Sequence, residues 1–436
     1  MKNVEEDVLE AVNRIGSQTK LALTSDDDLP ASLPRPQPPP TSLRPKLPTE
    51  VLDIAFSMLS KNHLKPLLYT NSFISALAIR RLYSDVVLAR PAVVVAFLTT
   101  VLKSERLPLL VRSLDINATN KALPTKNFYA LLARGLRRMP GLVSLTLELP
   151  KPHSPLWIFD GCTFRLTQFT TSMCSRRALA RFLETQPAIT ELTLRGYQTE
   201  SLIPPIISAS GRAGSQKSKG RADPDAFILR EGAMPNLRAF NTVHADEDLV
   251  RTIMEGRPVS VVSIPLFADT SAASLDALCS SSTPLRRLSA ISFDPTTPEA
   301  LFEALAKRFV DLEALHLVLL TAEYDQQVLR QCAVALSNFR CLKYITFMAA
   351  SSRPPTANPP TQPVAAQWHQ ACPTLKTIIL PEGRVWFRSQ GKSHSHGSAA
   401  APSVTAAVVA ATGGGDAGGA QEGGSGSQPQ MVWAAL

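Results

Sequence analysis

A short apolar pattern recurs along most of this chain and narrows the folds open to it. The pattern reads apolar-x-x-apolar-x-apolar, and its clearest copies begin at Leu142, Ile189, Leu312, Leu342 and Leu375. Weaker copies begin at Val111, Leu166, Leu237, Val259 and Leu285. Consecutive copies start 22 to 33 residues apart, except across one gap of 48 residues. A period of this size is typical of repeat architectures, in which each repeat is one supersecondary unit.

Segments with helical spacing lie between these copies. Three of them place their apolar residues on one helix face, and these sets are Phe128, Leu131, Leu132 and Leu136, then Leu179, Phe182 and Leu183, then Leu301, Phe302 and Leu305. Thr297 before Pro298 is typical of a helix N-terminus. One strand with one helix cannot bury its apolar side alone, whereas stacked units bury a continuous core. The sequence therefore predicts an α/β repeat solenoid, a curved array over residues 89–388.

The same pattern predicts which side chains face outward. Strand side chains alternate between the two faces of a sheet, so the residues between the apolar positions point to the concave face. These residues are Ser144, Thr146, Gln168, Glu191, Thr193, Asn241, Arg287, Ser289, His316, Tyr344 and Thr346. We expect a polar surface of mixed charge that suits recognition of a protein target. Arg287 and Tyr344 are the expected anchors, because Arg and Tyr are enriched among binding hot spots.

Three segments do not fit the repeat. Residues 1–46 contain the Pro-rich run at 34–40, which favours an extended and disordered segment. Residues 389–436 are rich in Gly, Ala and Ser, and we expect a disordered tail there as well. The gap of 48 residues contains a polar stretch at 208–225, which we interpret as an exposed insertion.

Residues 47–88 differ from both the tails and the repeats. Pro48 precedes an expected helix in which Val51, Ile54, Ala55, Met58 and Leu59 share one face and Leu52 and Phe56 form a neighbouring stripe. A second short helix carries Leu64, Leu67 and Leu68, a third runs over about 73–82, and a strand over 83–88 leads into the repeats. A short helix that is apolar around much of its circumference usually packs on two sides. One of those sides is a candidate for a partner.

This segment resembles an F-box. It opens with Leu-Pro-x-Glu-Val-Leu, continues with a Leu-rich second helix, and ends its third helix in Leu-Tyr-x-x-Val. The array that follows resembles the leucine-rich repeat family in its long, irregular form. The combination is similar to the fungal, basidiomycete-type F-box proteins with a C-terminal leucine-rich-repeat-like domain.

The resemblance implies a function and a set of contact residues. It implies a substrate-recognition subunit of an SCF-type ubiquitin ligase, in which the F-box docks a Skp-type adaptor of the cullin complex and the repeat domain binds a protein target. The adaptor-facing residues implied by the resemblance are Leu47, Pro48, Val51, Leu52, Leu59, Leu67, Leu68 and Phe73. The target-facing residues would be those of the concave face, chiefly Thr146, Glu191, Thr193, Asn241, Arg287, His316 and Tyr344.

Two other interpretations stay open. The segment 47–88 is also a candidate cap for the terminal apolar face of a repeat array, which would make the chain a protein-binding scaffold without a role in ubiquitin conjugation. The net charge is +9, and residues 47–388 carry about +11 because each tail carries −1. A basic repeat protein that binds nucleic acid is the weaker alternative, because the basic residues occur as dispersed pairs without interleaved aromatic residues.

No motif of a known chemistry stands out. We find no phosphate-binding GxxxxGK[ST] or GxGxxG sequence after a predicted strand and no GxSxG elbow, so we expect no enzyme activity, catalytic residue, metal or cofactor. The six cysteines are scattered without a CxxC pair, which is typical of reduced thiols in a cytoplasmic or nuclear protein. The sequence lacks a run of 18 apolar residues, so we expect no membrane partner.

Overall fold

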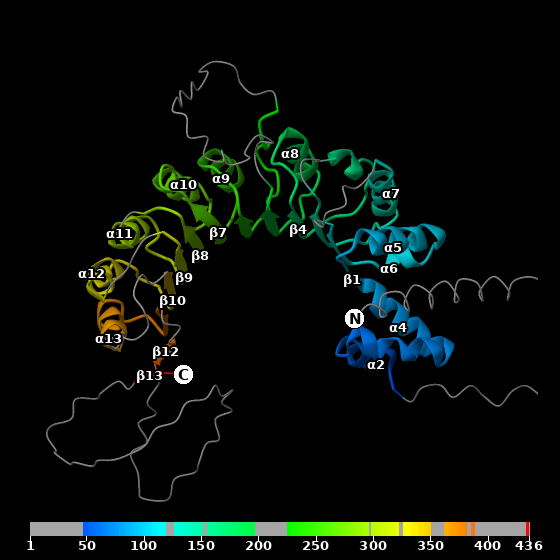
Figure 1. Ribbon diagram of the computed structural model, residues 1–436, viewed down its shortest axis with the longest axis horizontal. Helices are drawn as coiled ribbons and strands as arrows, with labels where there is room; N and C mark the ends of the chain where they lie inside the picture. The colour runs from blue at the N-terminus through cyan, green and yellow to red at the C-terminus, as the bar shows by residue number, and fades with distance from the viewer. Residues whose placement is uncertain are drawn as a thin grey trace, which may run out of the picture.

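The computed structural model describes residues 47–118, 126–150, 155–196, 225–295, 298–321, 326–349, 362–381, 385–388 and 433–435. These residues form a curved α/β array with a small helical module at its N-terminal end (Figure 1). The strands line the inner side of the arc and the helices cover its outer side (Figure 1).

The strands form one sheet in which each strand pairs with the next one in the chain. Their bounds are β1 (Asp85–Leu88), β2 (Ser113–Asn117), β3 (Ser144–Glu148), β4 (Gln168–Thr171), β5 (Glu191–Leu194), β6 (Ala239–Thr242), β7 (Val261–Leu266), β8 (Arg287–Ser292), β9 (Ala314–Leu319), β10 (Tyr344–Ala349), β11 (Thr377–Ile379), β12 (Val385–Arg388) and β13 (Trp433–Ala435). All pairs from β1 to β11 are parallel. The pairs of β12 with β11 and with β13 are antiparallel, which the repeat pattern did not predict.

Helices alternate with these strands. The array contains α5 (Pro91–Lys103), α6 (Leu107–Leu110), α7 (Lys126–Arg137), η2 (Leu156–Phe159), α8 (Arg177–Glu184), α9 (Glu247–Met254), α10 (Ser271–Leu278), α11 (Pro298–Arg308), α12 (Gln326–Leu336) and α13 (Gln362–Ala371). The module before it contains α2 (Thr49–Ser57), α3 (Lys61–Leu64), η1 (Pro66–Tyr69) and α4 (Ser72–Ser84). In the described part of the chain, no helix is long and apolar enough to cross a membrane.

The apolar pattern locates the strands of the array. Each of its ten copies is followed by a strand that begins two residues after the first apolar position, as Leu142 is by β3 and Leu375 by β11. The predicted helical faces at 128–136, 179–183 and 301–305 lie in α7, α8 and α11. The strand predicted over 83–88 begins later, at Asp85, because α4 continues to Ser84.

The gap of 48 residues adds no strand to the sheet, because β5 pairs directly with β6. The predicted insertion at 208–225 lies outside the described residues except for Asp225, which forms an ion pair with Arg176 at 3.2 Å. The N-terminal segment 1–46, the helix cap at Thr297 and the tail 389–436, apart from β13, also lie outside the described residues.

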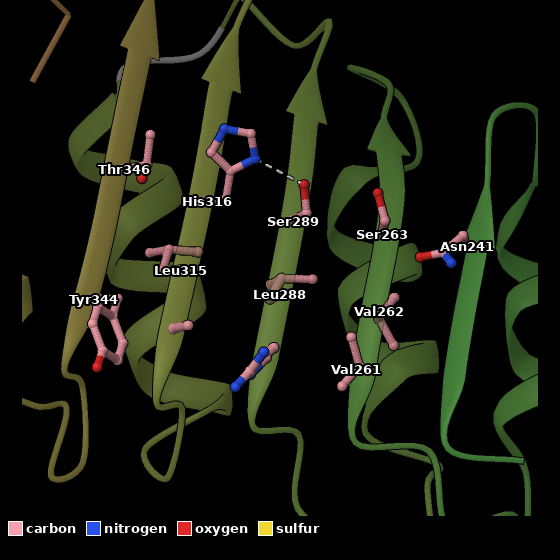
Figure 2. Close-up of a pocket in the computed structure, with 12 residues that line it drawn as sticks. Asn241, Val261, Val262, Ser263, Leu288, Ser289, Leu315, His316, Tyr344 and Thr346 are labelled. Atoms are coloured by element: carbon pink, nitrogen blue, oxygen red, sulfur yellow. Dashed lines mark hydrogen bonds between the residues drawn. The ribbon is translucent and has the colours of Figure 1, made fainter. Parts of the chain in front are cut away.

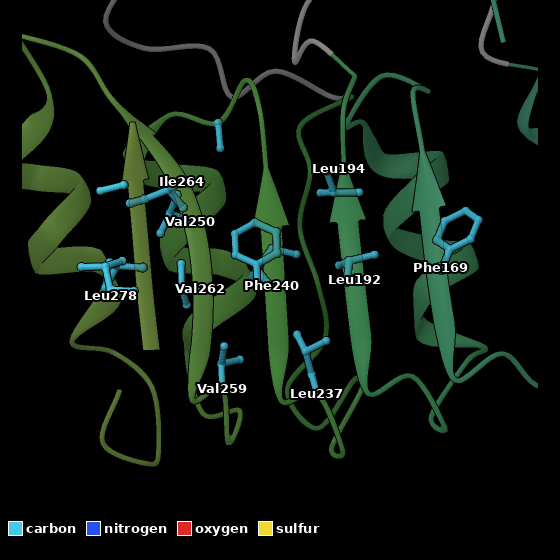
Figure 3. Close-up of a cluster of buried hydrophobic side chains, with 14 of the residues drawn as sticks. Phe169, Leu192, Leu194, Leu237, Phe240, Val250, Val259, Val262, Ile264 and Leu278 are labelled. Atoms are coloured by element: carbon cyan, nitrogen blue, oxygen red, sulfur yellow. The ribbon is translucent and has the colours of Figure 1, made fainter. Parts of the chain in front are cut away.

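The apolar side chains of strands and helices meet in one continuous core along the array. Leu192, Phe240 and Val262 are register partners on β5, β6 and β7 and lie side by side in this core (Figure 3). Farther along, the indole of Trp368 on α13 packs against Phe302 and Phe347 and donates a 2.6 Å hydrogen bond to the carbonyl of Leu329. The buried indole N–H is therefore satisfied where α13 meets α12.

Candidate protein-binding surfaces

The N-terminal module has a hydrophobic core of its own, separate from that of the array. Its buried residues are Phe56, Leu64, Leu68, Leu77 and Ala78. The Asn71 side chain caps the N-terminus of α4 by accepting a 2.9 Å hydrogen bond from the Ile74 amide. This cap satisfies one of the amides that the first turn of a helix leaves unpaired.

Helix α2 carries apolar residues on two sides, and the module core covers one of them. Phe56 is buried in that core and Leu52 packs against it. Ile54 and Met58 on the other side are 60% and 82% exposed. Together with Leu47 and Val51, which are also exposed, they form an uncovered apolar surface that we call the outer patch.

The predicted adaptor-facing residues divide between surface and core. Leu47, Pro48, Val51, Leu59 and Phe73 are exposed and therefore accessible to a partner. Leu68 belongs to the module core instead, and Leu52 and Leu67 are half-buried against it. The helical spacing of α2 identified both apolar stripes, but it did not tell which stripe α4 covers.

The module contacts the first strand of the array. The Lys61 ammonium on α3 donates a 2.6 Å hydrogen bond to the carbonyl of Asp85, the first residue of β1. Partial burial lowers the pKa of Lys61, and the nearby Asp85 carboxylate opposes this change. Beside this contact, Tyr83 at the end of α4 stacks on Phe97 of α5 with ring centroids 6.2 Å apart.

The predicted concave-face residues do lie on one surface, which we call the inner face. The parallel register joins them into two rows that run across the sheet. The first row is Ser144, Gln168, Glu191, Ala239, Val261, Arg287, Ala314 and Tyr344. The second row is Thr146, Thr170, Thr193, Asn241, Ser263, Ser289, His316 and Thr346.

Hydrogen bonds connect neighbours within these rows. The Ser289 hydroxyl lies 3.0 Å from Nδ1 of His316 (Figure 2), and the Asn241 amide donates to the Thr193 hydroxyl at 3.3 Å. In the first row the Gln168 amide donates to the Glu191 carboxylate at 3.2 Å. Each bond fixes two side chains on adjacent strands, so the inner face presents an ordered polar surface.

A shallow hollow of about 270 Å³ opens on the inner face over β6 to β10. It exists because the small side chains of Val261 and Ala314 flank Arg287 in the first row, and the larger Tyr344 on β10 follows Ala314. Tyr344 and His316 stand on one side of the hollow and Asn241 on the other (Figure 2). Arg287 makes no ion pair with any residue that the structure describes.

Both signs of charge occur on and beside the inner face, and they are unevenly distributed along it. Acidic groups gather over β2 to β5, where Glu148 accepts a 2.8 Å hydrogen bond from Asn117 and pairs with Arg195. Desolvation raises the pKa of Asp115, the neighbouring Glu148 carboxylate raises it further, and Arg195 opposes both effects. The carboxylates of Asp115 and Glu148 are close together because β2 pairs with β3.

Basic groups gather farther along the array, beside the first residues of β8 to β11. Glu313 forms ion pairs with Lys343 at 2.8 Å and with Arg286 at 3.2 Å. The hydrogen bond from Lys343 and the charges of Lys343, Arg286 and Arg287 lower the pKa of Glu313. The same hydrogen bond raises the pKa of Lys343. One carboxylate thus lies among three cations, and the positive charge predominates.

Exposed apolar side chains line the opposite end of the same strands. Phe267, Phe293 and Leu320 follow the last residues of β7, β8 and β9, and the backbone ladder continues through the amides of Phe293 and Leu320. The rings of Phe267 and Phe293 stack with centroids 5.3 Å apart and an angle of 16° between their planes. With Ile291, these residues form what we call the apolar rim, and all of them are more than a third exposed. The sequence analysis did not identify these residues, although strand alternation continued past each copy of the pattern would have indicated them.

The chain matches no protein-family model, and no curated protein matches it in sequence.

Proposed function

We propose that this chain is an F-box substrate-recognition subunit of an SCF-type ubiquitin ligase. The observation that carries the proposal is the outer patch, because it leaves Ile54 and Met58 uncovered by both the module core and the array. Exposed apolar surface on a small folded module is typical of a protein-docking site. Helix α2, which carries the patch, lies at one end of the arc, beyond β1 (Figure 1).

In this proposal the array is a leucine-rich-repeat-like solenoid whose inner face binds a protein target. The one-strand, one-helix alternation and the parallel, in-register rows support that architecture. The chain then acts by proximity, since a target held on the array has a high effective concentration of lysines near the ubiquitin carrier. No residue of the chain takes part in bond chemistry in this mechanism.

The contact between Lys61 and Asp85 favours a second candidate, a protein-binding scaffold without a ubiquitin role. A module that packs on the first strand meets the requirement of a repeat array for a terminal cap. The two candidates share the inner face and differ in whether the outer patch binds an adaptor.

Co-expression of the full chain with a Skp-type adaptor, followed by gel filtration, tests the proposal. The informative variant is Ile54→Asp/Met58→Asp, because both side chains are exposed and their replacement leaves the module core intact. The matched control is Val334→Asp, which adds a charge at a 77% exposed apolar position on α12.

We expect the adaptor to co-elute with the wild-type chain and with the Val334→Asp control, but not with the double variant. Circular dichroism of all three proteins should be the same. If the wild-type chain elutes without the adaptor, the ubiquitin proposal is wrong and the scaffold proposal replaces it. Co-elution of the double variant would show that the adaptor binds somewhere other than the outer patch.

A further inference from the structure

The inner face over β7 to β10 has different chemistry at its two ends. Arg287 and Lys343 lie where β8 and β10 begin, with Arg286 and a single carboxylate, Glu313, beside them. Phe267, Phe293 and Leu320 lie where β7, β8 and β9 end. Arg287 begins β8 and Phe293 directly follows its last residue, so the two are six positions apart, which is about 20 Å at the rise of a β-strand.

The surface between these ends is polar and hollowed. Ser289 and His316 occupy its middle, and the small side chains of Val261 and Ala314 leave Arg287 accessible from the hollow. A chain segment that lies in the hollow therefore meets the Arg287 guanidinium at one end and apolar side chains at the other. The complementary partner carries acidic and apolar residues at a matching separation.

We infer that the inner face over β7 to β10 binds an extended segment of a protein target that places acidic side chains against Arg287 and apolar side chains against the apolar rim. This inference rests on the proposed function to the extent that it takes the inner face as the target-binding surface. The segment runs along the strands, so its acidic and apolar residues are about five to seven positions apart.

Charge and ring geometry favour such a segment over a nucleic acid. The cations lie at one edge of the sheet, and the carboxylates of Asp115, Glu148 and Glu191 occupy the continuation of the same face. A polyanion that extends along the array would meet these carboxylates. Phe267 and Phe293 are stacked on each other, so one face of each ring is covered and is not accessible for stacking with a nucleic-acid base.

A phage-displayed library of random peptides about twelve residues long tests the inference, since that length spans the face. The library is panned against the immobilised full chain after phage that bind the double variant Arg287→Glu/Phe293→Ser have been removed. We expect enriched peptides with Asp or Glu and, about five to seven residues away, Phe, Leu or Ile. Enrichment without acidic residues, or no enrichment, would overturn the inference.

The most enriched peptide, labelled with a fluorophore, is then measured by anisotropy. Arg287→Glu and Phe293→Ser should each weaken its binding about tenfold or more, and added salt should weaken it further. The controls are Arg134→Glu on α7, which makes the same charge reversal, and Val334→Ser on α12, which also replaces an exposed apolar side chain by serine; both positions lie on the outer helices. If the controls weaken binding as much, or if a labelled single-stranded oligonucleotide binds more tightly than the peptide, the inference is wrong.

Adaptor binding is measured separately on the same proteins. Loss of peptide binding by Arg287→Glu with adaptor binding intact supports both proposals. A wild-type chain that binds the adaptor but selects no acidic–apolar peptide overturns the inference and leaves the proposed function standing. If the chain binds the peptide but no adaptor, the inference stands and the proposed function is replaced by that of a protein-binding scaffold.

Discussion

The Arg257 guanidinium donates a 2.7 Å hydrogen bond from Nε to the carbonyl of Ala233. The residue is 4% exposed, and its Nη1 donates to the carbonyls of Thr252 and Ile253 at 2.7 and 3.1 Å. Those two carbonyls belong to the last turn of α9, where a helix lacks intrahelical donors and favours positive charge. One side chain thus joins the end of α9 to the loop that leads into β6.

Replacement of this arginine should destabilise the array. We expect Arg257→Met to lower the free energy of unfolding by about 3 kcal/mol or more, because several buried carbonyls lose their donor. Arg257→Lys should lower it less, since one ammonium keeps the charge but cannot span the same carbonyls. Urea denaturation followed by circular dichroism measures both effects. Equal midpoints for Arg257→Met and the exposed control Arg138→Met would contradict this account.

The residues of the inner face could be predicted from the sequence, because strand side chains alternate and the repeat pattern marks the buried positions. Thr193, Asn241 and Ser289 were each placed on the concave face, and the register joins them in one row. What the sequence did not predict was which groups become neighbours across strands. Glu148 and Arg195 are 47 positions apart, and their pairing depends on β4 lying between their strands.

In the module, the sequence did not predict which side of a helix is buried. Helical spacing placed Leu52 and Phe56 on one stripe and Ile54 and Met58 on another. Spacing alone does not tell which of two apolar stripes is buried and which is exposed. The packing of α4 against α2 decides this, because it buries Phe56 and leaves Met58 exposed. The antiparallel strand β12 follows the last copy of the repeat, so periodicity gave no signal for it.

The separate core of the module predicts separate unfolding. Phe56→Ala removes the largest side chain of a cluster of few buried residues, and a change of this kind costs about 3–5 kcal/mol at a buried site. We expect hydrogen exchange to accelerate over α2 to α4 while β8 to β10 keep their protection. The exposed Met58→Ala serves as the control and should change neither region. Faster exchange throughout the array would show that the two cores unfold together.

The raised pKa of Asp115 predicts a pH-dependent gain of stability when its charge is removed. Desolvation and the Glu148 carboxylate disfavour the ionised form in the folded chain, so this carboxylate destabilises the fold above its unfolded pKa. Asp115→Asn should therefore raise the midpoint of thermal unfolding at neutral pH, by about a few tenths of a kcal/mol in free energy at most, because water screens partly exposed charges. The gain should shrink as the pH falls and the carboxyl of the wild type becomes protonated. The exposed control Asp311→Asn should show no such trend in calorimetry, and a loss of stability for Asp115→Asn at neutral pH would refute the prediction.

The six free cysteines should differ widely in their reaction with N-ethylmaleimide. Cys279 and Cys341 are exposed, whereas Cys174, Cys332 and Cys372 are buried. Burial raises the pKa of Cys162 to about 11 and that of Cys332 to about 12, which leaves little of the reactive thiolate near neutral pH. Peptide mass spectrometry of a labelling time course should find Cys341 and Cys279 modified first and Cys332 only after denaturation. Early modification of Cys332 would contradict the packing of α12.

The position of Glu313 predicts a substitution that strengthens target binding. Its carboxylate pairs with Arg286 and Lys343, and its charge also acts on Arg287. Glu313→Gln removes the one negative charge from this cluster, so the selected acidic–apolar peptide should bind several-fold more tightly at low salt, and the gain should fade as salt is added. The control Glu303→Gln makes the same change at an exposed position on α11, and the peptide affinity should stay the same. The lowered pKa of Glu313 also means that its ion pairs stabilise the fold above its unfolded pKa and are lost as the pH falls through the folded value. Anisotropy titrations across a salt series separate the two variants, and weaker peptide binding by Glu313→Gln would show that Arg287 does not contact the acidic residues of the partner.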